Sequence, residues 1–273
     1  MDSNEILLKT EKDLTELENS YYQDLKSNKN NISYWYPKIK NCGIKQPKTF
    51  IFPIPLNIMK CFFLENKDDK NKITKWVREE LYPNIPQELK NKNLFIKNGC
   101  FSNKFDFATA IPRHNTVECI SECIQEIQYA SFCMDTMGNS EIAIREQIGY
   151  SPNETPCIYN GLPLRNEYRV FYDFTKHKFL YIVNYWDWAY CHDCICSNKT
   201  DKIIYESVYD DLLKHYLANK EKVRELVSDK LKSVTELEGA WSVDIMEDNG
   251  DFWLIDMALA KDSAYWKENN LYY

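Results

Sequence analysis

Apolar residues recur along the chain with two periods, one typical of helices and one typical of strands. The helical period is clearest in residues 115–132, where Asn115 or Thr116 can cap the first turn. The apolar face of that segment holds Val117, Ile120, Ile124 and Ile127. Helices are also predicted in residues 5–27 and 73–85, the second ending before Pro83, and one or two helices in residues 201–234.

Short apolar runs predict strands in residues 49–52, 94–98 and 141–150, the last running into a connector. Residues 166–174 and 178–188 read as two strands joined by a tight polar turn, and residues 241–262 form a final hairpin. Because hairpins dominate the second half of the chain, the pattern favours an α+β fold over a doubly wound parallel sheet.

The final hairpin, WSVDIMEDNGDFWLIDMALAKD, contains two aspartates whose relation depends on the turn. A two-residue turn at Asn249 and Gly250 would put Asp244 and Asp256 on opposite faces of the sheet. A three-residue loop, residues 249–251, would pair them directly and would gather most apolar side chains, Ile255 among them, on the other face. Because a buried, unpaired carboxylate is costly, this segregation favours the three-residue loop.

Paired in that way, the two aspartates would have Cβ atoms about 5 Å apart. Like charges at that distance repel unless a cation lies between them, and Mg²⁺ prefers carboxylate oxygen ligands. The alternative is that each acid pairs with a nearby lysine such as Lys261. The hairpin alone leaves both interpretations open.

Three basic residues lie on or at the end of predicted strands: Lys97, Arg145 and Arg169. Arginine binds phosphate or carboxylate through two parallel hydrogen bonds, and lysine acts on phosphate as a compact charge. Two of these positions also have a plainer explanation. A lysine at a strand end, such as Lys97, can reach water, and Arg169 shares a face with Glu167, with which it can form a salt bridge.

Composition narrows the classes of partner. The 273 residues carry a net charge of −7, which argues against a general affinity for nucleic acid or an anionic membrane. Glycine occurs only seven times, and neither GxGxxG nor GxxxxGK[ST] is present. A nucleotide would therefore have to be held mainly by side chains.

The N-terminus is charged, and no run approaches the ~20 apolar residues of a membrane span, so a cytoplasmic protein with reduced thiols is expected. The densest group of cysteines is Cys191, Cys194 and Cys196, with His192 among them. No second cysteine or histidine pair follows at a spacing suited to zinc, which favours buried or loop thiols over a zinc site.

Four stretches, in this order, resemble the ATP-grasp proteins. The resemblance is to the clade marked by one lysine and two arginines, which includes a eukaryotic cell-cycle protein that assembles translation initiation factor two. The stretches are LFIKNGCFSNKFDF, EIAIREQI, LRNEYRVFYDF and WSVDIMEDNGDFWLIDMALA, spanning about residues 94–260. The resemblance implies an ATP-grasp-like α+β fold with two α+β lobes enclosing ATP, residues 91–150 and 151–273, after a small N-terminal α/β lobe, residues 1–90.

The resemblance also implies roles for individual residues. Lys97 would contact the α- and β-phosphates, and Lys104 would be a second basic residue beside them. Arg169 would face the γ-phosphate or an acyl-phosphate, so that Lys97 and Arg169 are the expected catalytic residues. Asp244 and Asp256 would bind Mg²⁺. The connector along adenine would be Arg145, Glu146, Gln147 and Ile148.

One position departs from the family pattern. Two residues after the last metal-binding acid the family usually has asparagine, whereas this chain has Ala258. Alanine cannot bind a metal, so the site would be one ligand short unless water, Asp262 or a phosphate replaces it. This departure bears on catalysis more than on nucleotide binding.

The resemblance implies an ADP-forming ligase that joins a small-molecule or peptide carboxylate to an amine through an acyl-phosphate. The alternative is a non-catalytic, ATP-dependent assembly factor with a protein partner, which Ala258 favours. A structural domain with solvated charges is the third possibility. No nucleic-acid or membrane partner is expected. The aromatic stretch NYWDWAYCHD, residues 184–193, can line an acceptor pocket, although core positions are favoured for several of its rings.

Overall fold

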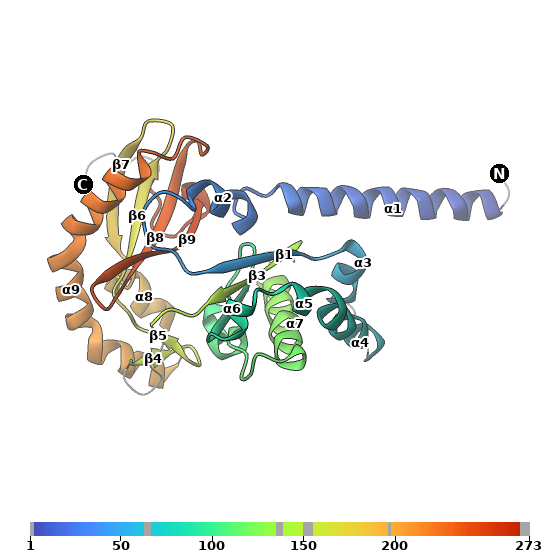
Figure 1. Ribbon diagram of the computed structural model, residues 1–273, viewed down its shortest axis with the longest axis horizontal. Helices are drawn as coiled ribbons and strands as arrows, with labels where there is room; N and C mark the ends of the chain where they lie inside the picture. The colour runs from blue at the N-terminus through green and yellow to red at the C-terminus, as the bar shows by residue number, and fades with distance from the viewer. Residues whose placement is uncertain (1–2, 63–66, 135–138, 150–154, 196–197, 268–273) are drawn as a thin grey trace.

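Two antiparallel sheets form the framework of the protein. The computed structural model describes residues 3–62, 67–134, 139–149, 155–195 and 198–267 (Figure 1). One sheet has the order β1-β3-β2, the other has the order β7-β6-β8-β9, and a short ribbon pairs β4 with β5. The strands are β1 Thr49–Pro53, β2 Leu94–Asn98, β3 Glu141–Glu146, β4 Cys157–Ile158, β5 Leu162–Pro163, β6 Glu167–Asp173, β7 Lys178–Asn184, β8 Ala240–Asp248 and β9 Asp251–Leu259.

Helices surround both sheets, which confirms the predicted α+β class. They are α1 Ser3–Ser27, α2 Ile32–Ile39, α3 Leu56–Met59, α4 Lys67–Trp76, α5 Tyr82–Asn84, α6 Gln87–Lys90, α7 Val117–Cys133, α8 Trp188–Ile195 and α9 Lys199–Leu231. Residues 201–234 therefore contain one long helix. None of the helices in the described parts of the chain is long and apolar enough to cross a membrane.

The first sheet packs against α7, whose apolar face the sequence predicted. Ile120, Ile124 and Ile127 are fully buried in one core with Ile96 of β2 and Ile142 of β3. Thr116 is the cap residue of α7, because its Oγ1 accepts a hydrogen bond from the backbone N of Cys119 at 3.3 Å. Burying each isoleucine contributes roughly 1.5–3 kcal/mol, so this helix fixes the sheet that carries Lys97 and Arg145.

Residues 1–90 contribute directly to the first sheet, because β1 pairs with β3 from Thr49–Arg145 to Pro53–Glu141. The helix predicted to end before Pro83 does not end there. A π-helical turn, Val77–Leu81, follows α4 and leads into α5, where Pro83 lies in the first turn. Proline is tolerated at that position because its missing N–H would have no partner within the helix.

The second sheet is covered by the long helix α9, which runs along its outer side (Figure 1). Val223, Val227 and Leu231 of α9 are fully buried in one core with Val170 of β6 and Val243 of β8. α2 belongs to the same core, whereas α1 extends outward from its C-terminal part, where Tyr22 and Leu25 pack against the core of the first sheet (Figure 1). One face of β8 and β9 is thus committed to the core, and the other is free to form a site.

The turn of the final hairpin differs from the prediction. Asp248 pairs with Asp251, so the turn has two residues, Asn249 and Gly250, with φ of 51° and 81°. The three-residue loop was wrong, because asparagine and glycine tolerate the positive φ that a tight type I′ turn requires. The predicted pairing of Asp244 with Asp256 is nevertheless present.

A β-bulge at Ile255 reconciles these two observations. Ile245 pairs with Leu254 and Asp244 pairs with Asp256, so Ile255 is the extra residue. One inserted residue shifts the register by one and returns Asp256 to the face of Asp244. Leu254 therefore enters the core, and Ile255, predicted to lie there, instead lines a cavity.

Candidate active site

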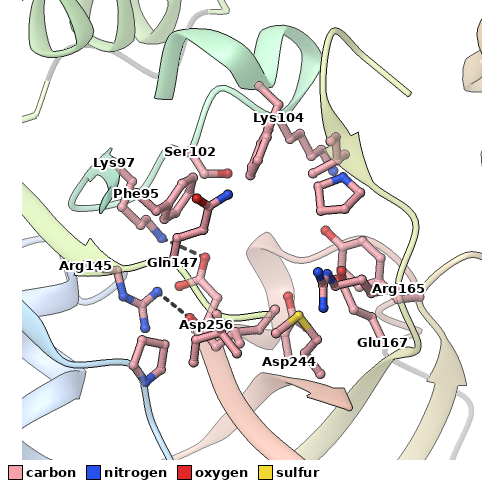
Figure 2. A pocket seen from close by; sticks show the side chains of 18 of the residues that line it. Phe95, Lys97, Ser102, Lys104, Arg145, Gln147, Arg165, Glu167, Asp244 and Asp256 are labelled. Atoms are coloured by element: carbon pink, nitrogen blue, oxygen red, sulfur yellow. Dashed lines mark hydrogen bonds and ion pairs between the residues drawn. The ribbon is translucent and has the colours of Figure 1, made fainter. Parts of the chain in front are cut away.

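A cavity between the two sheets brings together most of the residues that the sequence singled out (Figure 2). β2 and β3 contribute one side, and β6, β8 and β9 contribute the other. Every predicted site residue except Arg169 lines this cavity: Lys97, Lys104, Arg145, Glu146, Gln147, Ile148, Asp244 and Asp256. Arg169 lies at its edge and lines two adjoining cavities instead.

Lys97 and Asp256 form an ion pair between the two sheets. Lys97 Nζ lies 2.7 Å from Asp256 Oδ2, and Lys97 is 1% exposed. The lysine at the end of β2 is therefore not a surface residue that reaches water. A buried ammonium requires a compensating acceptor, and Asp256 provides it.

Arg169 and Asp244 form a second pair within the second sheet. The two residues are directly opposite in the register of β6 and β8. Arg169 Nε and Nη2 donate to Asp244 Oδ1 and Oδ2 at 2.8 and 2.7 Å, and the guanidinium lies 4.8 Å from the centre of the Tyr185 ring. Although burial opposes it, the Asp244 carboxylate holds the pKa of Arg169 above its usual value. The aspartates are thus paired with Lys97 and Arg169, and not with Lys261.

Arg145 joins β3 to the bulge of β9. Its Nε donates to Thr49 Oγ1 at 3.1 Å, and its Nη1 donates to the carbonyl of Ile255 at 2.5 Å. Its Nη2 is buried and has no hydrogen-bond partner in the described part of the chain. Burial lowers the pKa of this guanidinium. An unpaired buried donor is costly, so a ligand acceptor at this point would be favourable.

Glu167 is a further acid in the cavity, which the sequence reasoning did not assign to the site. Figure 2 shows it across the cavity from Lys97 and Arg145. Burial, assisted by the nearby Asp244 carboxylate, raises the pKa of Glu167 to about 8. Near neutral pH this residue therefore carries a proton and can donate a hydrogen bond. The signal was available, because strand alternation already placed Glu167 on the face of Arg169.

Lys104 stands at the junction of the main cavity with both adjoining ones. It follows Asn103, whose φ of 46° turns the chain at the start of a 3₁₀-helix, Lys104–Ala110. Burial, and then the charge of Arg169, lower the pKa of Lys104. Its ammonium is 5.9 Å from the centre of the Tyr185 ring. Among the described residues no carboxylate forms an ion pair with Lys104.

Apart from Tyr185 and Trp186, which belong to the aromatic stretch 184–193, the rest of the lining was not predicted. Arg165 donates to Asp248 Oδ1 at 3.0 Å, and the buried Oε1 of Gln147 has no partner among the residues described. The remaining side chains are largely apolar and come from segments far apart in the sequence: Pro47, Phe95, Phe107, Leu162, Pro163, Tyr185, Trp186, Met246 and Ile255. Apolar walls with a few convergent polar groups are typical of small-molecule sites.

Asp244 and Asp256 can hold a divalent cation, but no third carboxylate, histidine or cysteine of the described residues lies close enough to complete a cluster of three. Ala258 lies opposite Ser242 and has no ligating group. Asp262 lines an adjoining cavity with Ala258 and Asp256, and its Oδ2 accepts from Asn30 Nδ2 at 2.8 Å. The oxygen donors fit Mg²⁺, whose remaining ligands would come from phosphate and water.

The aromatic stretch contributes to both site and core. Tyr185 and Trp186 line the main cavity, and Trp186 is also buried in a core cluster with Tyr205. Trp188 is 37% exposed and packs on Tyr205 with ring centres 5.7 Å apart. Cys191 is buried beside Tyr265, with its Sγ 3.7 Å from the tyrosine hydroxyl. The side chains of His192, Cys194 and Cys196 lie outside the described residues.

No family model and no curated protein matches this sequence. Solved structures do match it. C-terminally truncated Cdc123 from Schizosaccharomyces pombe gives a TM-score of 0.48 at 15% identity, covering 84% of this chain and 83% of that one. D-alanine–D-alanine ligase from Bacillus anthracis, complexed with ATP, gives 0.37 at 10% identity, covering 84% of this chain and 52% of that one.

The corresponding ligase from Helicobacter pylori gives a TM-score of 0.39 at 13% identity, covering 84% of this chain and 50% of that one. This chain thus spans about half the length of each ligase and most of the length of Cdc123. At these TM-scores the similarity carries no functional argument, and the case for a function rests on the residues of the cavity.

Proposed function

We propose that this protein binds Mg-ATP in the cavity between its sheets and acts as an ADP-forming carboxylate–amine ligase. One observation carries the proposal: Lys97 and Arg145 from one sheet meet Asp244, Asp256 and Arg169 from the other around a single cavity and its edge. Cations suited to phosphate and a carboxylate pair suited to magnesium are the parts that phosphoryl transfer requires.

The apolar lining of the cavity can accommodate the base of the nucleotide. Phe95, Ile148, Leu162 and Met246 offer flat walls for a base beside the polar groups of Gln147. The backbone of the connector, residues 145–148, is held in place by two neighbouring segments. Glu146 N donates to the carbonyl of Lys48, and Gln147 N donates to that of Asn93. Rigid backbone next to an unpaired side-chain amide favours a planar ligand with its own hydrogen-bonding edge.

In the proposed reaction a carboxylate oxygen attacks the γ-phosphorus, and ADP leaves with the electrons of the broken P–O bond. The acyl-phosphate is then attacked at carbon by an amine, which loses a proton, and phosphate leaves. Bound magnesium would neutralise phosphate charge between Asp244 and Asp256. Lys97, Arg145 and Arg169 would orient the phosphate chain and oppose its charge, so catalysis would rest on alignment and charge neutralisation.

A second function has an observation in its favour. Ala258 leaves the carboxylate pair without the third side-chain ligand, which would weaken catalysis more than binding. An ATP-dependent assembly factor, as the alternative reading of the sequence proposes, would bind Mg-ATP, release no ADP with any small amine, and retain a protein partner.

Calorimetric titration with a non-hydrolysable ATP analogue and MgCl₂ tests Mg-ATP binding, which both functions require. The unmodified protein should bind, and Asp256→Asn and Lys97→Ala should each weaken binding at least tenfold. Lys12→Ala, which changes an exposed lysine on α1, is the control and should bind normally. Unchanged binding by both site variants would show that the site is wrongly assigned.

Hydroxylamine then separates the two functions. It intercepts acyl-phosphates as hydroxamates, so a ligase supplied with ATP, Mg²⁺ and a suitable acid should yield equal amounts of ADP and hydroxamate. An assembly factor should yield neither while still binding the analogue.

A further inference from the structure

A second cavity adjoins the main one on the far side of Arg169. Its lining includes four aromatic residues that do not reach the main cavity, Phe105, Tyr159, Tyr190 and Tyr265, which together we call the aromatic chamber. They come from four separate segments: the 3₁₀-helix after Asn103, the turn between β4 and β5, α8, and the stretch after β9. Tyr185 lines both cavities and connects them.

The chamber holds its rings in pairs and leaves part of them open. Phe105 meets Tyr159 edge to face at 5.2 Å between ring centres, and Tyr190 meets Tyr265 at 4.6 Å. Phe105 is 46% exposed and Tyr190 is 47% exposed. Exposed aromatic rings gathered around a cavity mark a binding surface more often than scattered single ones do.

Two of these tyrosines have strained backbones. Tyr159 has φ of 49° and Tyr265 has φ of 69°, in the left-handed region that bulky residues rarely adopt. The surroundings hold Tyr265 there, because its hydroxyl donates to the carbonyl of Tyr185 at 3.0 Å and its carbonyl accepts from the Tyr181 hydroxyl at 3.0 Å. Such conformations persist only where surrounding structure imposes them, and they gather at ligand sites.

Two cations stand at the inner end of the chamber. Lys104 and Arg169 both line it, and the charge of Arg169 contributes to lowering the pKa of Lys104. Asp244 occupies only Nε and Nη2 of Arg169, and neither Arg169 Nη1 nor Lys104 Nζ has a hydrogen-bond acceptor among the residues described here. Although Arg169 is paired with Asp244, its Nη1 and Lys104 Nζ can each still donate a hydrogen bond, and one shared anion would accept from both.

We infer that the acid activated by this protein places its carboxylate between Lys104 and Arg169 and an aromatic group in the aromatic chamber. This inference rests on the proposed function, because it makes that carboxylate the one that accepts the γ-phosphoryl group. The geometry suits the step, since Lys104 borders both cavities and the carboxylate would lie where they meet. A free arylalkanoic acid and the C-terminal aromatic residue of a peptide share this chemistry.

The test uses the protein saturated with a non-hydrolysable ATP analogue and Mg²⁺, with calorimetric titration of three small probes. 3-Phenylpropionate has both the ring and the charge, 3-phenylpropionamide lacks the charge, and propionate lacks the ring. Phenylpropionate should bind at least tenfold more tightly than either of the others. Equal binding of the acid and the amide, or of the acid with and without its ring, would overturn the inference.

Substitutions in the aromatic chamber and at Lys104 test where the acid binds. Tyr190→Ala should bring phenylpropionate down to the affinity of propionate while analogue binding stays unchanged. Phe132→Ala, which removes a ring that is 55% exposed on α7, is the matched control and should change neither. Lys104→Met, resaturated with the analogue, should abolish the advantage of the acid over the amide. A preference that survives both Tyr190→Ala and Lys104→Met places the acid elsewhere and also overturns the inference.

Two further probes distinguish the sources of the acid. Glycylphenylalanine binding more tightly than phenylpropionate would identify a peptide C-terminus, and the reverse order would identify a free acid; glycylphenylalanine amide should bind weakly in either case. Binding of the ATP analogue distinguishes a failure of this inference from a failure of the proposed function. If the analogue binds and the probes do not discriminate, the proposed function stands without this inference; if the analogue does not bind, both fall.

Discussion

At the scale of single residues, the two ion pairs of the site differ in how their partners meet water. In the Lys97–Asp256 pair the lysine side chain is 2% exposed, whereas the aspartate side chain is 35% exposed. Breaking a buried pair is destabilising mainly because of the charge that remains buried and alone. The exposed fractions of the two side chains therefore determine which substitution lowers the free energy of unfolding more.

We expect Asp256→Ala to destabilise the protein more than Lys97→Met. Loss of Asp256 leaves a buried ammonium unpaired, which costs about 3 kcal/mol or more. Loss of Lys97 leaves a carboxylate that water can reach, and should cost about half as much or less. Free energies of unfolding from urea titration check the order. The double variant should be more stable than Asp256→Ala alone, and a larger loss for Lys97→Met would contradict the argument.

Glu167 makes the free energy of unfolding depend on pH, and the direction of its pKa shift gives the sign. Its pKa is raised from 4.5 to about 8 by burial first and then by Asp244. Between those values the folded state keeps a proton that the unfolded state has released. The contribution of Glu167 to stability is therefore complete below the unfolded pKa and is lost as the pH rises to about 8.

Glu167→Gln keeps the shape and neutrality of the protonated acid, so it should remove this dependence. At pH 9 we expect it to raise the free energy of unfolding by on the order of 2 kcal/mol, with little effect at pH 4. Glu236→Gln, an exposed glutamate, is the control. Chemical denaturation across this range measures both. Parallel pH profiles for the unmodified protein and Glu167→Gln would show that Glu167 is ionised like a surface acid.

At the scale of elements, the sequence predicted correctly those strands and helices that depend on interactions between residues close together in the chain. The strand at residues 94–98 and the helix capped by Thr116 follow from periodicity and capping, and both are present. The bulge at Ile255 has no such signal. It involves a contact from another sheet, because Arg145 donates to the Ile255 carbonyl across 110 residues of sequence. Only the tendency to segregate charged from apolar residues indicated that the aspartates would share a face.

The junction between α2 and the first sheet depends on Gly99. A Cβ there would lie 2.6 Å from Asn139 Oδ1, 2.7 Å from Glu141 Oε1 and 2.8 Å from Asn31 Oδ1. These three side chains are buried, and the Ile32 N–H donates to the Gly99 carbonyl at 3.1 Å. The start of α2 is thus attached to β2 and β3 at a point with no room for a side chain.

Gly99→Ala should therefore destabilise the protein by about 3 kcal/mol, at the upper end of the usual range, through crowding. Gly250→Ala is the contrast, because nothing lies within 4 Å of a Cβ at Gly250 and only its φ of 81° opposes the change. We expect a loss of about 1 kcal/mol there. Thermal and urea unfolding of the two variants should give this order, and equal losses would mean that the cluster around Gly99 rearranges readily.

At the scale of the whole molecule, the site exists only where the two sheets meet. Lys97 of β2 contacts Asp256 of β9, and Arg145 of β3 contacts the carbonyl of Ile255. The sequence predicted that these residues belong to one site through a resemblance, since their separation along the chain gives no physical reason for them to meet. Most of the apolar walls were missed because nothing local distinguishes a cavity wall from a core residue. Glu167 was missed although strand alternation had already placed it on the face of Arg169.

If the protein binds Mg-ATP as proposed, the two ion pairs would make magnesium and ATP binding depend on each other. Mg²⁺ alone must displace Lys97 and Arg169 from the aspartates, and ATP alone must displace the aspartates from the cations; either leaves charges uncompensated. When both bind, phosphate would pair with the cations while magnesium would pair with the carboxylates. The rise in melting temperature with both should therefore exceed the sum of the rises with each alone, since only bound ligand stabilises the fold.

Differential scanning fluorimetry with MgCl₂, with ATP and EDTA, and with MgCl₂ plus ATP measures this coupling. Arg169→Gln releases Asp244 from its partner, so this variant should respond to MgCl₂ alone where the unmodified protein does not. Arg224→Gln, which removes an exposed arginine paired with Glu221 on α9, should behave like the unmodified protein. Additive shifts in the unmodified protein would mean that magnesium and nucleotide bind without exchanging these partners, and that the two ion pairs persist when the site is filled.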